Sequence, residues 1–205
     1  MDYETSGPTA YVDSSAATTS TKIVIAGGFG VGKTTLVGAV SEIEPLTTEA
    51  VMTEASTNVD DLSQTPDKTT TTVAMDFGRV SLDSDLILYL FGTPGQHRFW
   101  FMWDDLVRGA IGAVVLVDSR RLTDCFGAID FFEARKLPFV IAVNRFDGML
   151  LHSLDDVREA LALSPTIPVL TTDARSREAT KKTLIALVEH AMRRTEEELA
   201  SRALR

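Results

Sequence analysis

Several features are scarce in this chain of 205 residues, and each scarcity narrows the range of functions. Cys125 is the single cysteine, which excludes an intrachain disulfide framework and a cysteine-based zinc cluster and favours a reducing compartment. No apolar run approaches the roughly 20 residues that span a bilayer. The termini carry no signal-peptide, myristoylation or prenylation pattern. We therefore expect a cytoplasmic protein without a direct membrane anchor.

Basic residues are too few and too scattered to form a nucleic-acid surface. The net charge is −9, and residues 1–67 hold 10 acidic and 2 basic side chains, whereas residues 68–205 hold 19 and 18. A phosphate backbone is repelled by this acidic front part, and no stripe of Lys and Arg offsets the repulsion. The sequence therefore argues against a nucleic-acid partner.

The remaining composition, 44% hydrophobic and 24% charged, is that of an ordinary globular domain. Residues 1–20 are an exception, because Ser, Thr, Ala and acids without an apolar period predict a disordered acidic arm. In residues 21–205 short buried strands alternate with helices, which predicts one α/β domain with a six-stranded, mostly parallel sheet flanked by helices. We expect strands at 23–26, 73–82, 86–91, 111–117, 139–143 and 167–170, and helices at 33–43, 99–108, 122–135, 154–163 and from 177. The strands 73–82 and 86–91 should form an antiparallel hairpin.

One glycine-rich segment carries the strongest chemical signal. Residues 27–34 read Gly-Gly-Phe-Gly-Val-Gly-Lys-Thr and fit the pattern G-x-x-x-x-G-K-[ST], between an expected strand and an expected helix. The glycines let backbone N–H groups wrap a phosphate, and the helix N-terminus adds positive potential. Lys33 would reach the β- and γ-phosphates, and Thr34 would offer its hydroxyl to Mg²⁺. The expected nucleotide contacts here are Gly27, Gly28, Phe29, Gly30, Val31, Gly32, Lys33, Thr34 and Thr35.

A second polar segment has the chemistry to select the base. Asn144, Arg145, Phe146 and Asp147 follow directly on the expected strand 139–143, at the sheet edge where open α/β folds bind ligands. A carboxylate at Asp147 could accept hydrogen bonds from the N1–H and 2-amino groups of guanine, whereas adenine would present an acceptor to it. The segment therefore favours GTP over ATP.

Together these motifs resemble those of the small GTPase superfamily over nearly the whole of residues 20–200. Asn144-Arg145-Phe146-Asp147 stands where Ras-like GTPases have N-K-x-D, and Gly92-Thr93-Pro94-Gly95-Gln96 stands where they have D-x-x-G-Q. The run from Thr72 to Phe77, the Thr-Pro-Gly-Gln core and Arg145 more closely resemble bacterial gliding-motility GTPases and the conservon-type ATP/GTP-binding proteins of actinomycetes.

The resemblance implies a P-loop, Ras-like G domain that binds GTP and GDP with Mg²⁺ and acts as a molecular switch. It also implies a roadblock-type regulator protein as partner and a membrane sensor kinase reached through partners. Thr72 matches the switch I threonine that closes over the γ-phosphate, and Gly95 matches the switch II glycine that senses this phosphate. Gln96 matches the glutamine that orients the attacking water. Asp173, Ala174 and Arg175 lie where the family contacts the guanine oxygen; the implied catalytic residues are Gln96, Lys33 and Thr72, and the implied metal ligands are Thr34 and Thr72.

Three departures from the family pattern bear on the chemistry. Gly92 replaces the acidic residue that holds a Mg²⁺-bound water, so we expect this carboxylate support to be missing and the Mg²⁺ dependence to be weak. Phe29 places a ring beside the γ-phosphate, where it could obstruct an inserted arginine or displace Gln96, and this predicts slow hydrolysis. Arg145 in place of Lys is milder, because its stem can still cover the base.

Two alternatives to a GTPase switch stay open. One is a pseudo-GTPase scaffold with little or no hydrolysis, for which Gly92 and Phe29 are the grounds. The other is an ATP-using enzyme such as a small-molecule kinase, although the chain has no arginine-rich lid and Asp147 disfavours adenine. Arg98, Arg120 and Arg121 could supply an internal arginine finger, but the sequence favours surface charges.

The two segments that would sense the nucleotide have unusual compositions. Residues 44–72 are acidic and rich in Thr, and we interpret them as an extended switch I, the alternative being a spacer without a readout. Phe99 to Trp103 are five successive apolar residues in an expected helix, so they cannot all face the core. This run indicates a partner-binding surface, with a wholly buried switch II as the alternative.

Overall fold

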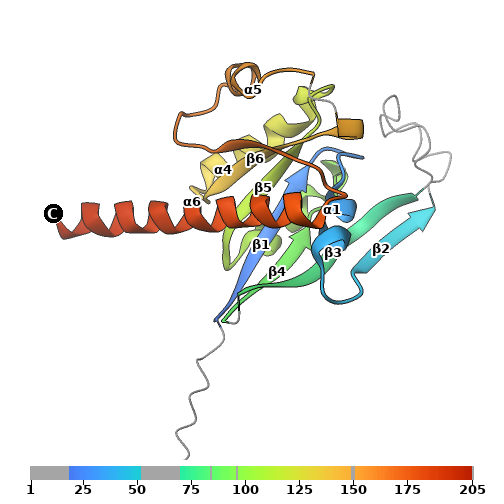
Figure 1. Ribbon diagram of the computed structural model, residues 1–205, viewed down its shortest axis with the longest axis horizontal. Coiled ribbons are helices and arrows are strands. Elements are labelled where there is room, and N and C mark those ends of the chain that lie inside the picture. Colours follow the sequence, from blue (N-terminus) through green and yellow to red (C-terminus); the bar gives the residue numbers. More distant parts are fainter. Residues whose placement is uncertain (1–18, 52–69, 84, 96, 149–150, 205) are drawn as a thin grey trace, which may run out of the picture.

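A mixed β-sheet with helices on both of its faces forms the centre of the protein (Figure 1). The computed structural model describes residues 19–51, 70–83, 85–95, 97–148 and 151–204. The sheet has seven strands in the order β2-β3-β4-β1-β5-β6-β7. The strands are β1 Thr19–Gly27, β2 Leu46–Val51, β3 Thr70–Asp83, β4 Leu86–Gly92, β5 Ala110–Val117, β6 Phe139–Asn144 and β7 Val169–Thr172.

The helices connect these strands as the alternating sequence pattern predicts. The α-helices are α1 Lys33–Val40, α3 Trp103–Val107, α4 Phe126–Ala134, α5 Leu154–Ala160 and α6 Arg177–Ala203. The 3-10 helices in these described ranges are η1 His97–Met102, η2 Leu122–Cys125 and η3 Phe146–Gly148. The single helix expected at 99–108 is divided between η1 and α3. None of the helices in the described ranges is long and apolar enough to cross a membrane.

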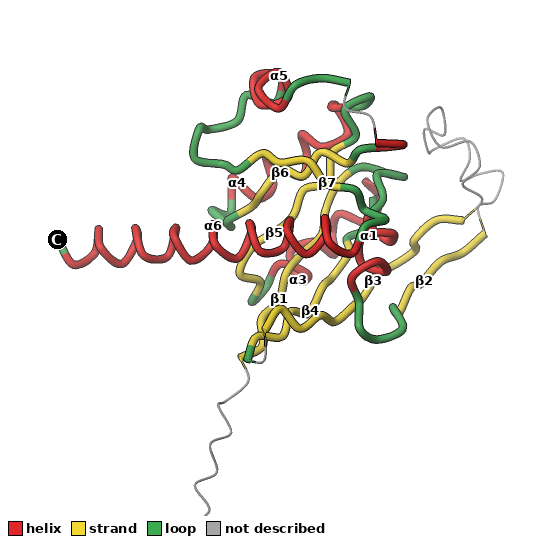
Figure 2. Tube along the Cα trace, in the orientation of Figure 1, coloured by secondary structure: helices red, strands yellow, loops and turns green. Residues whose placement is uncertain are grey.

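The strand directions confirm the predicted mixed α/β fold. β4, β1, β5, β6 and β7 run parallel to one another, whereas β3 pairs antiparallel with both β2 and β4. The expected count of six strands is wrong, because the acidic connection after α1 contributes β2 at the edge of the sheet (Figure 2). β2 is held by pairing with the long β3, from Leu46 opposite Phe77 to Val51 opposite Thr70.

Two expected segments are described only in part. The acidic arm expected over residues 1–20 overlaps β1, which begins at Thr19, and residues 1–18 lie outside the described residues. Of the segment 44–72 interpreted as an extended switch I, residues 52–69 also lie outside them.

Two apolar cores lie on opposite faces of the sheet, and both require the central strands to be apolar throughout. In β1, Ile23 and Ile25 pack with α1 and α6, whereas Val24 and Ala26 pack with α3, α4 and α5. Strands buried on both faces are typical of parallel sheets. Because the parallel strands end at one edge, Gly27, Asp118 and Asn144 are brought together there.

Candidate nucleotide site

The predicted P-loop lies between β1 and α1, as its motif requires. β1 ends at Gly27, and α1 begins at Lys33 after Gly32, whose φ of 102° is one that L side chains rarely adopt. A Cβ on Gly27 would collide with the backbone carbonyl of Leu116 in β5. The glycines at these two positions are therefore required by the backbone path of the loop.

Lys33 is folded back into this loop. Its side chain is 7% exposed, and its Nζ donates to the carbonyl oxygens of Gly27 at 2.9 Å and Gly28 at 2.7 Å. An ammonium group this buried is stable only among oxygen acceptors, and phosphate oxygens are stronger acceptors than carbonyls. The loop thus holds a cation where the motif places the β- and γ-phosphates.

Gly95 also lies against the P-loop. A Cβ built on it would lie 2.7 Å from Lys33 Nζ and 3.0 Å from the Cα of Phe29. Lys33, Phe29 and Gly95 therefore converge on one point, where the family resemblance places the γ-phosphate. Gln96, the residue expected to orient water, lies outside the described residues.

The carboxylate that Gly92 lacks is supplied by Asp76, which corrects the expectation that it is missing. Thr34 Oγ1 donates to Asp76 Oδ2 at 2.9 Å, and Asp76 is 1% exposed. Asp76 in β3 stands directly opposite Gly92 in β4, and a Cβ on Gly92 would lie 2.8 Å from Asp76 Oδ2. The space left by the glycine is thus filled by an acid from the neighbouring strand.

A magnesium ion fits this donor set. Mg²⁺ in nucleotide sites uses one or two carboxylates and a hydroxyl beside the phosphate oxygens, and Thr34 with Asp76 offers one of each. Thr72, the other expected ligand, lies in β3 with its backbone opposite Glu49 of β2, and its side chain lies outside the described part of the chain. Asp76 is the ligand candidate that motif matching along the chain missed.

Asn144 joins the P-loop to the segment expected to contact the base. Its side-chain Nδ2 donates to the carbonyl of Val31 at 3.0 Å, and its Oδ1 accepts from the backbone N–H of Ala174 at 3.0 Å. Asn144 is 6% exposed, so both bonds are shielded from water. The predicted segments 27–34, 144–147 and 173–175 therefore meet in the structure.

The flanking residues of these segments are placed by local bonds. Arg145 is exposed, and its backbone N–H donates to Thr172 O at 2.8 Å. Asp173 accepts from the backbone N–H of Arg175 at 3.0 Å, and hydrogen bonds from Arg175 lower the pKa of the Asp173 carboxyl. Asp147 belongs to η3, and its side chain lies outside the described part of the chain.

The segment after β5 adds polar residues that the motifs did not identify. Asp118 directly follows β5 and is 5% exposed, and Arg120 binds both its carboxylate oxygens, with Nη2 at 2.7 Å from Oδ2. Burial alone would raise the pKa of Asp118, but the hydrogen bonds and charge of Arg120 outweigh burial and lower it. The Arg120 guanidinium also lies over the ring of Phe146, 4.3 Å from its centroid.

The aromatic run of the expected switch II is divided between the core and the surface. Trp103 is 1% exposed and Phe101 is 75% exposed. Trp100 packs on Trp103 with ring centroids 5.2 Å apart. The alternative of a wholly buried switch II is therefore wrong, because Phe101 points to solvent.

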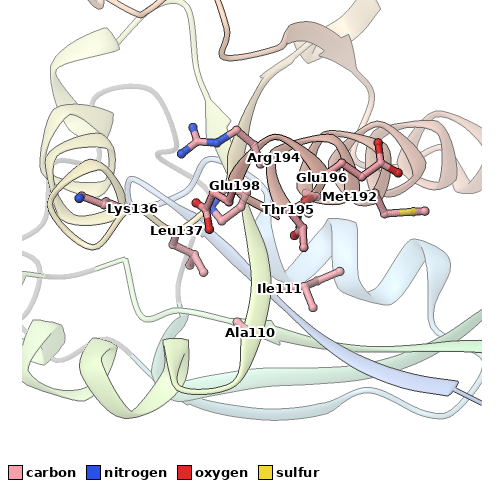
Figure 3. Close-up of a pocket in the computed structure, with 11 residues that line it drawn as sticks. Ala110, Ile111, Lys136, Leu137, Met192, Arg194, Thr195, Glu196 and Glu198 are labelled. Carbon is pink, nitrogen blue, oxygen red and sulfur yellow. Dashed lines mark hydrogen bonds between the residues drawn. The ribbon is translucent and has the colours of Figure 1, made fainter. Parts of the chain in front are cut away.

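A separate groove of about 480 Å³ lies at the opposite end of the sheet. Figure 3 shows that it is lined by Ala110 and Ile111 at the start of β5 and by residues such as Met192 and Arg194 of α6. In the pairing of β5 with β1, Ala110 stands opposite Lys22. Lys22 precedes Gly27, the first residue of the P-loop, by five residues. The groove is thus remote from the nucleotide site.

The fold and this site define a P-loop nucleotide-binding protein with the architecture of a small GTPase. The chain belongs to the family described as conserved hypothetical ATP binding protein, which matches residues 25–194. It is 33% identical over 128 residues to an uncharacterized protein of Methanocaldococcus jannaschii, covering 62% of this chain and 70% of that protein.

A solved structure of similar fold is that of the Arl6 BBS3 small GTPase from Trypanosoma brucei with bound nucleotide analogue GppNp. The TM-score is 0.60 at 16% sequence identity, and the match covers 85% of this chain and 99% of the other. At this identity the likeness is one of fold.

Proposed function

We propose that the protein binds GTP and GDP with Mg²⁺ and hydrolyses GTP slowly as a molecular switch. The observation that carries the proposal is the double contact of Asn144, which fixes the P-loop against the segments expected to bind guanine. A phosphate site and a base site held at a fixed distance select one class of ligand, a nucleotide.

The residues of the P-loop supply the chemistry at the phosphate end. Lys33 would exchange the carbonyls of Gly27 and Gly28 for phosphate oxygens and stabilise the charge that develops on the transferred group. Thr34 and Asp76 would hold Mg²⁺, which supplies further positive charge at the phosphates. Water, oriented by Gln96, attacks the γ-phosphorus as the bond to the β,γ-bridging oxygen breaks, giving GDP and inorganic phosphate.

The base end favours guanine on chemical grounds. The family description and one of our alternatives point to ATP, so the choice rests on the proposed role of Asp147. A carboxylate accepts from the N1–H and 2-amino groups of guanine and is left without a donor by adenine. Under this proposal ATP binds much more weakly than GTP.

The pseudo-GTPase alternative loses one of its two grounds. Gly92 suggested weak metal support, yet Asp76 places a buried carboxylate beside Thr34. The remaining ground is Phe29, which concerns the rate of hydrolysis and not metal binding. We therefore favour slow hydrolysis over none.

A protein partner completes the proposed switch. We propose a roadblock-type regulator and, through partners, a sensor kinase that recruits the protein to the membrane. Phe101 belongs to the expected switch II and its side chain is exposed, so a partner that covers it would be sensitive to the bound nucleotide.

The test is a calorimetric titration of nucleotide-free protein with GDP, GTP and ATP, with and without Mg²⁺, followed by single-turnover hydrolysis of bound GTP. We expect guanine nucleotides to bind at least about 100-fold more tightly than ATP. The hydrolysis rate should fall well below the roughly 5–20 s⁻¹ of activator-stimulated GTPases.

Two variants calibrate this test. Lys33→Ala should abolish nucleotide binding, whereas Lys182→Ala, which removes an exposed ion pair with Glu178 on α6, should leave it unchanged. Equal affinity for ATP and GTP would contradict the proposal. Bound GTP that persists without hydrolysis would favour the pseudo-GTPase.

A further inference from the structure

The structure places one arginine next to the expected γ-phosphate position, although the sequence favoured a surface charge for it. We propose that Arg121 is a catalytic arginine, supplied by this chain itself, that stabilises the negative charge developing on the γ-phosphate during GTP hydrolysis. This inference rests on the proposed function and adds to it a residue that the family motifs do not contain.

The first observation is the burial of Arg121 against the P-loop. Its side chain is 8% exposed, and its Nη2 donates to the backbone carbonyl of Phe29 at 2.6 Å. Phe29 is the third residue of the G-x-x-x-x-G-K-[ST] pattern. An arginine from a segment 92 positions along the chain is thus bonded directly to the phosphate-binding loop.

The second observation is the packing that holds this arginine in place. Arg121 Nε lies 3.4 Å from Asp124 Oδ2, in the short helix η2. Asp124 in turn packs on the P-loop, because a Cβ on Gly28 would lie 2.6 Å from the Cβ of Asp124. The glycine therefore lets η2 close on the loop and fixes the arginine beside Phe29.

The third observation is where the backbone of Phe29 lies. Phe29 Cα is 3.0 Å from the Cβ position of Gly95, and Lys33 Nζ is 2.7 Å from the same position. Lys33 and the backbone of Gly95 are the groups expected to contact the γ-phosphate. Arg121 is thus hydrogen-bonded to Phe29, the residue beside which Lys33 and Gly95 converge.

The adjacent arginine, Arg120, does not share this position. Arg120 is held by both carboxylate oxygens of Asp118 and lies over Phe146, which belongs to the expected base segment. The side chain of Arg98 lies outside the described part of the chain. Of the two candidates whose side chains the structure describes, Arg120 and Arg121, Arg121 is the one bonded to the P-loop.

The chemistry of this position matches the reaction. A guanidinium is charged at all physiological pH values and presents five N–H donors in a plane, so it can bind a phosphate oxygen while keeping its bond to Phe29. The transition state carries negative charge on the γ-phosphoryl oxygens and on the leaving oxygen of GDP, and a fixed cation in a water-poor site stabilises this charge most. The arginine takes up no proton and remains unchanged.

The position of Arg121 also changes the effect that we expect Phe29 to have on hydrolysis. The sequence suggested that its ring blocks an arginine inserted by a partner protein. An arginine anchored on the backbone carbonyl of Phe29 needs no such insertion. GTPases that carry their arginine within the chain hydrolyse GTP at about 10⁻² s⁻¹, which still falls within slow hydrolysis as proposed above.

The test compares wild type with Arg121→Ala, Arg121→Lys and the control Arg108→Ala, whose side chain is 82% exposed and pairs with Asp105. For each protein we would measure the single-turnover rate of bound GTP, the affinity for GDP, the thermal melting point, and binding of GDP with aluminium fluoride, a mimic of the transferred phosphoryl group.

We expect Arg121→Ala to lower the hydrolysis rate at least about 100-fold and to abolish the aluminium fluoride complex. Its GDP affinity should stay within about threefold of wild type, because GDP carries no γ-phosphate. Arg121→Lys keeps the charge but loses the planar donor fork, and should lose at least about 10-fold in rate. Arg108→Ala should behave as wild type.

Other results would overturn the inference in distinguishable ways. If wild type hydrolyses GTP and both Arg121 variants hydrolyse bound GTP at the same rate, with only the melting point or nucleotide affinity lowered, Arg121 merely anchors the loop and the proposed function stands. If wild type itself binds GTP without hydrolysing it, the proposed hydrolysis fails and the catalytic role of Arg121 fails with it.

Discussion

At the scale of single residues, buried polar side chains define the site more sharply than the glycine motif does. Lys33, Asp76, Asp118 and Asn144 are each at most 7% exposed, and all lie near the carboxyl edge of the parallel strands. Burying polar groups lowers stability unless they are paired, so their clustering indicates a functional edge. By contrast, burial raises the pKa of the Cys125 thiol to about 12, which fits a packed residue and not a nucleophile.

A pH prediction belongs to His190, which is 2% exposed on α6. Burial lowers its pKa, and the charges of Arg193 and Arg194 lower it further, against an opposing contribution from Glu197. The unfolded chain, with a histidine pKa near 6.5, therefore binds a proton before the folded protein does as the pH falls. The contribution of His190 to stability is complete above about pH 6.5 and is lost as the pH falls towards the lowered pKa.

Urea unfolding at pH 7.5 and pH 5.5 would measure this effect. Wild type should lose stability between the two values, and His190→Leu should lose distinctly less. The exposed His152 provides the control, since His152→Gln should retain the wild-type loss. An identical loss in His190→Leu and wild type would show that other groups cause the pH dependence.

At the scale of secondary-structure elements, the β3–β4 hairpin determines the metal chemistry. Its register places Asp76 of β3 opposite Gly92 of β4, so that the acid occupies the space beside Thr34. Asp76→Ala should reduce the effect of Mg²⁺ on GDP affinity by roughly 10- to 100-fold, as expected for a carboxylate that supports a metal. Gly92→Asp alone should also disturb Mg²⁺ binding, because its side chain would collide with Asp76.

Exchanging the two residues gives a sharper test. The double variant Asp76→Gly with Gly92→Asp returns one carboxylate to the same place from the neighbouring strand, and should recover part of the Mg²⁺ effect lost in each single variant. Dissociation of a fluorescent GDP analogue with and without a chelator reports this effect. Asp85→Ala, exposed at the far end of the hairpin, is the control. An unchanged Mg²⁺ response in Asp76→Ala would exclude a role for this acid.

The hairpin also shows which structural features can be predicted from the sequence and which cannot. The sequence predicts that strands 73–82 and 86–91 pair antiparallel, and in the structure this pairing sets Asp76 opposite Gly92. A motif along the chain compares Gly92 with its sequence neighbours and not with its neighbour across the sheet, so it does not identify Asp76. β2 was missed because its Thr-rich, acidic segment has little apolar periodicity; pairing with β3 stabilises it, a tertiary effect that local propensity does not contain.

At the scale of the whole molecule, the order of strands and helices could be predicted because the central strands are apolar on both faces. Ile23 to Ala26 and Ile111 to Val117 form continuous apolar runs, and a parallel sheet covered by helices requires such runs. The position of the P-loop and of Asn144 followed from the strand ends. The place of Arg121 could not be predicted, because contact with Phe29 depends on how η2 packs on the P-loop.

The central claim is that the protein has a guanine-nucleotide site in which Asp147 binds the base. The most direct test of this claim is the base preference of the variant Asp147→Asn. Xanthine presents a carbonyl where guanine has its 2-amino group, and an amide side chain can donate to it. We predict that Asp147→Asn loses GTP affinity at least about 100-fold and gains affinity for XTP, as measured by calorimetry on nucleotide-free protein. Unchanged GTP affinity in the variant, or ATP binding as tight as GTP binding in wild type, would contradict the claim.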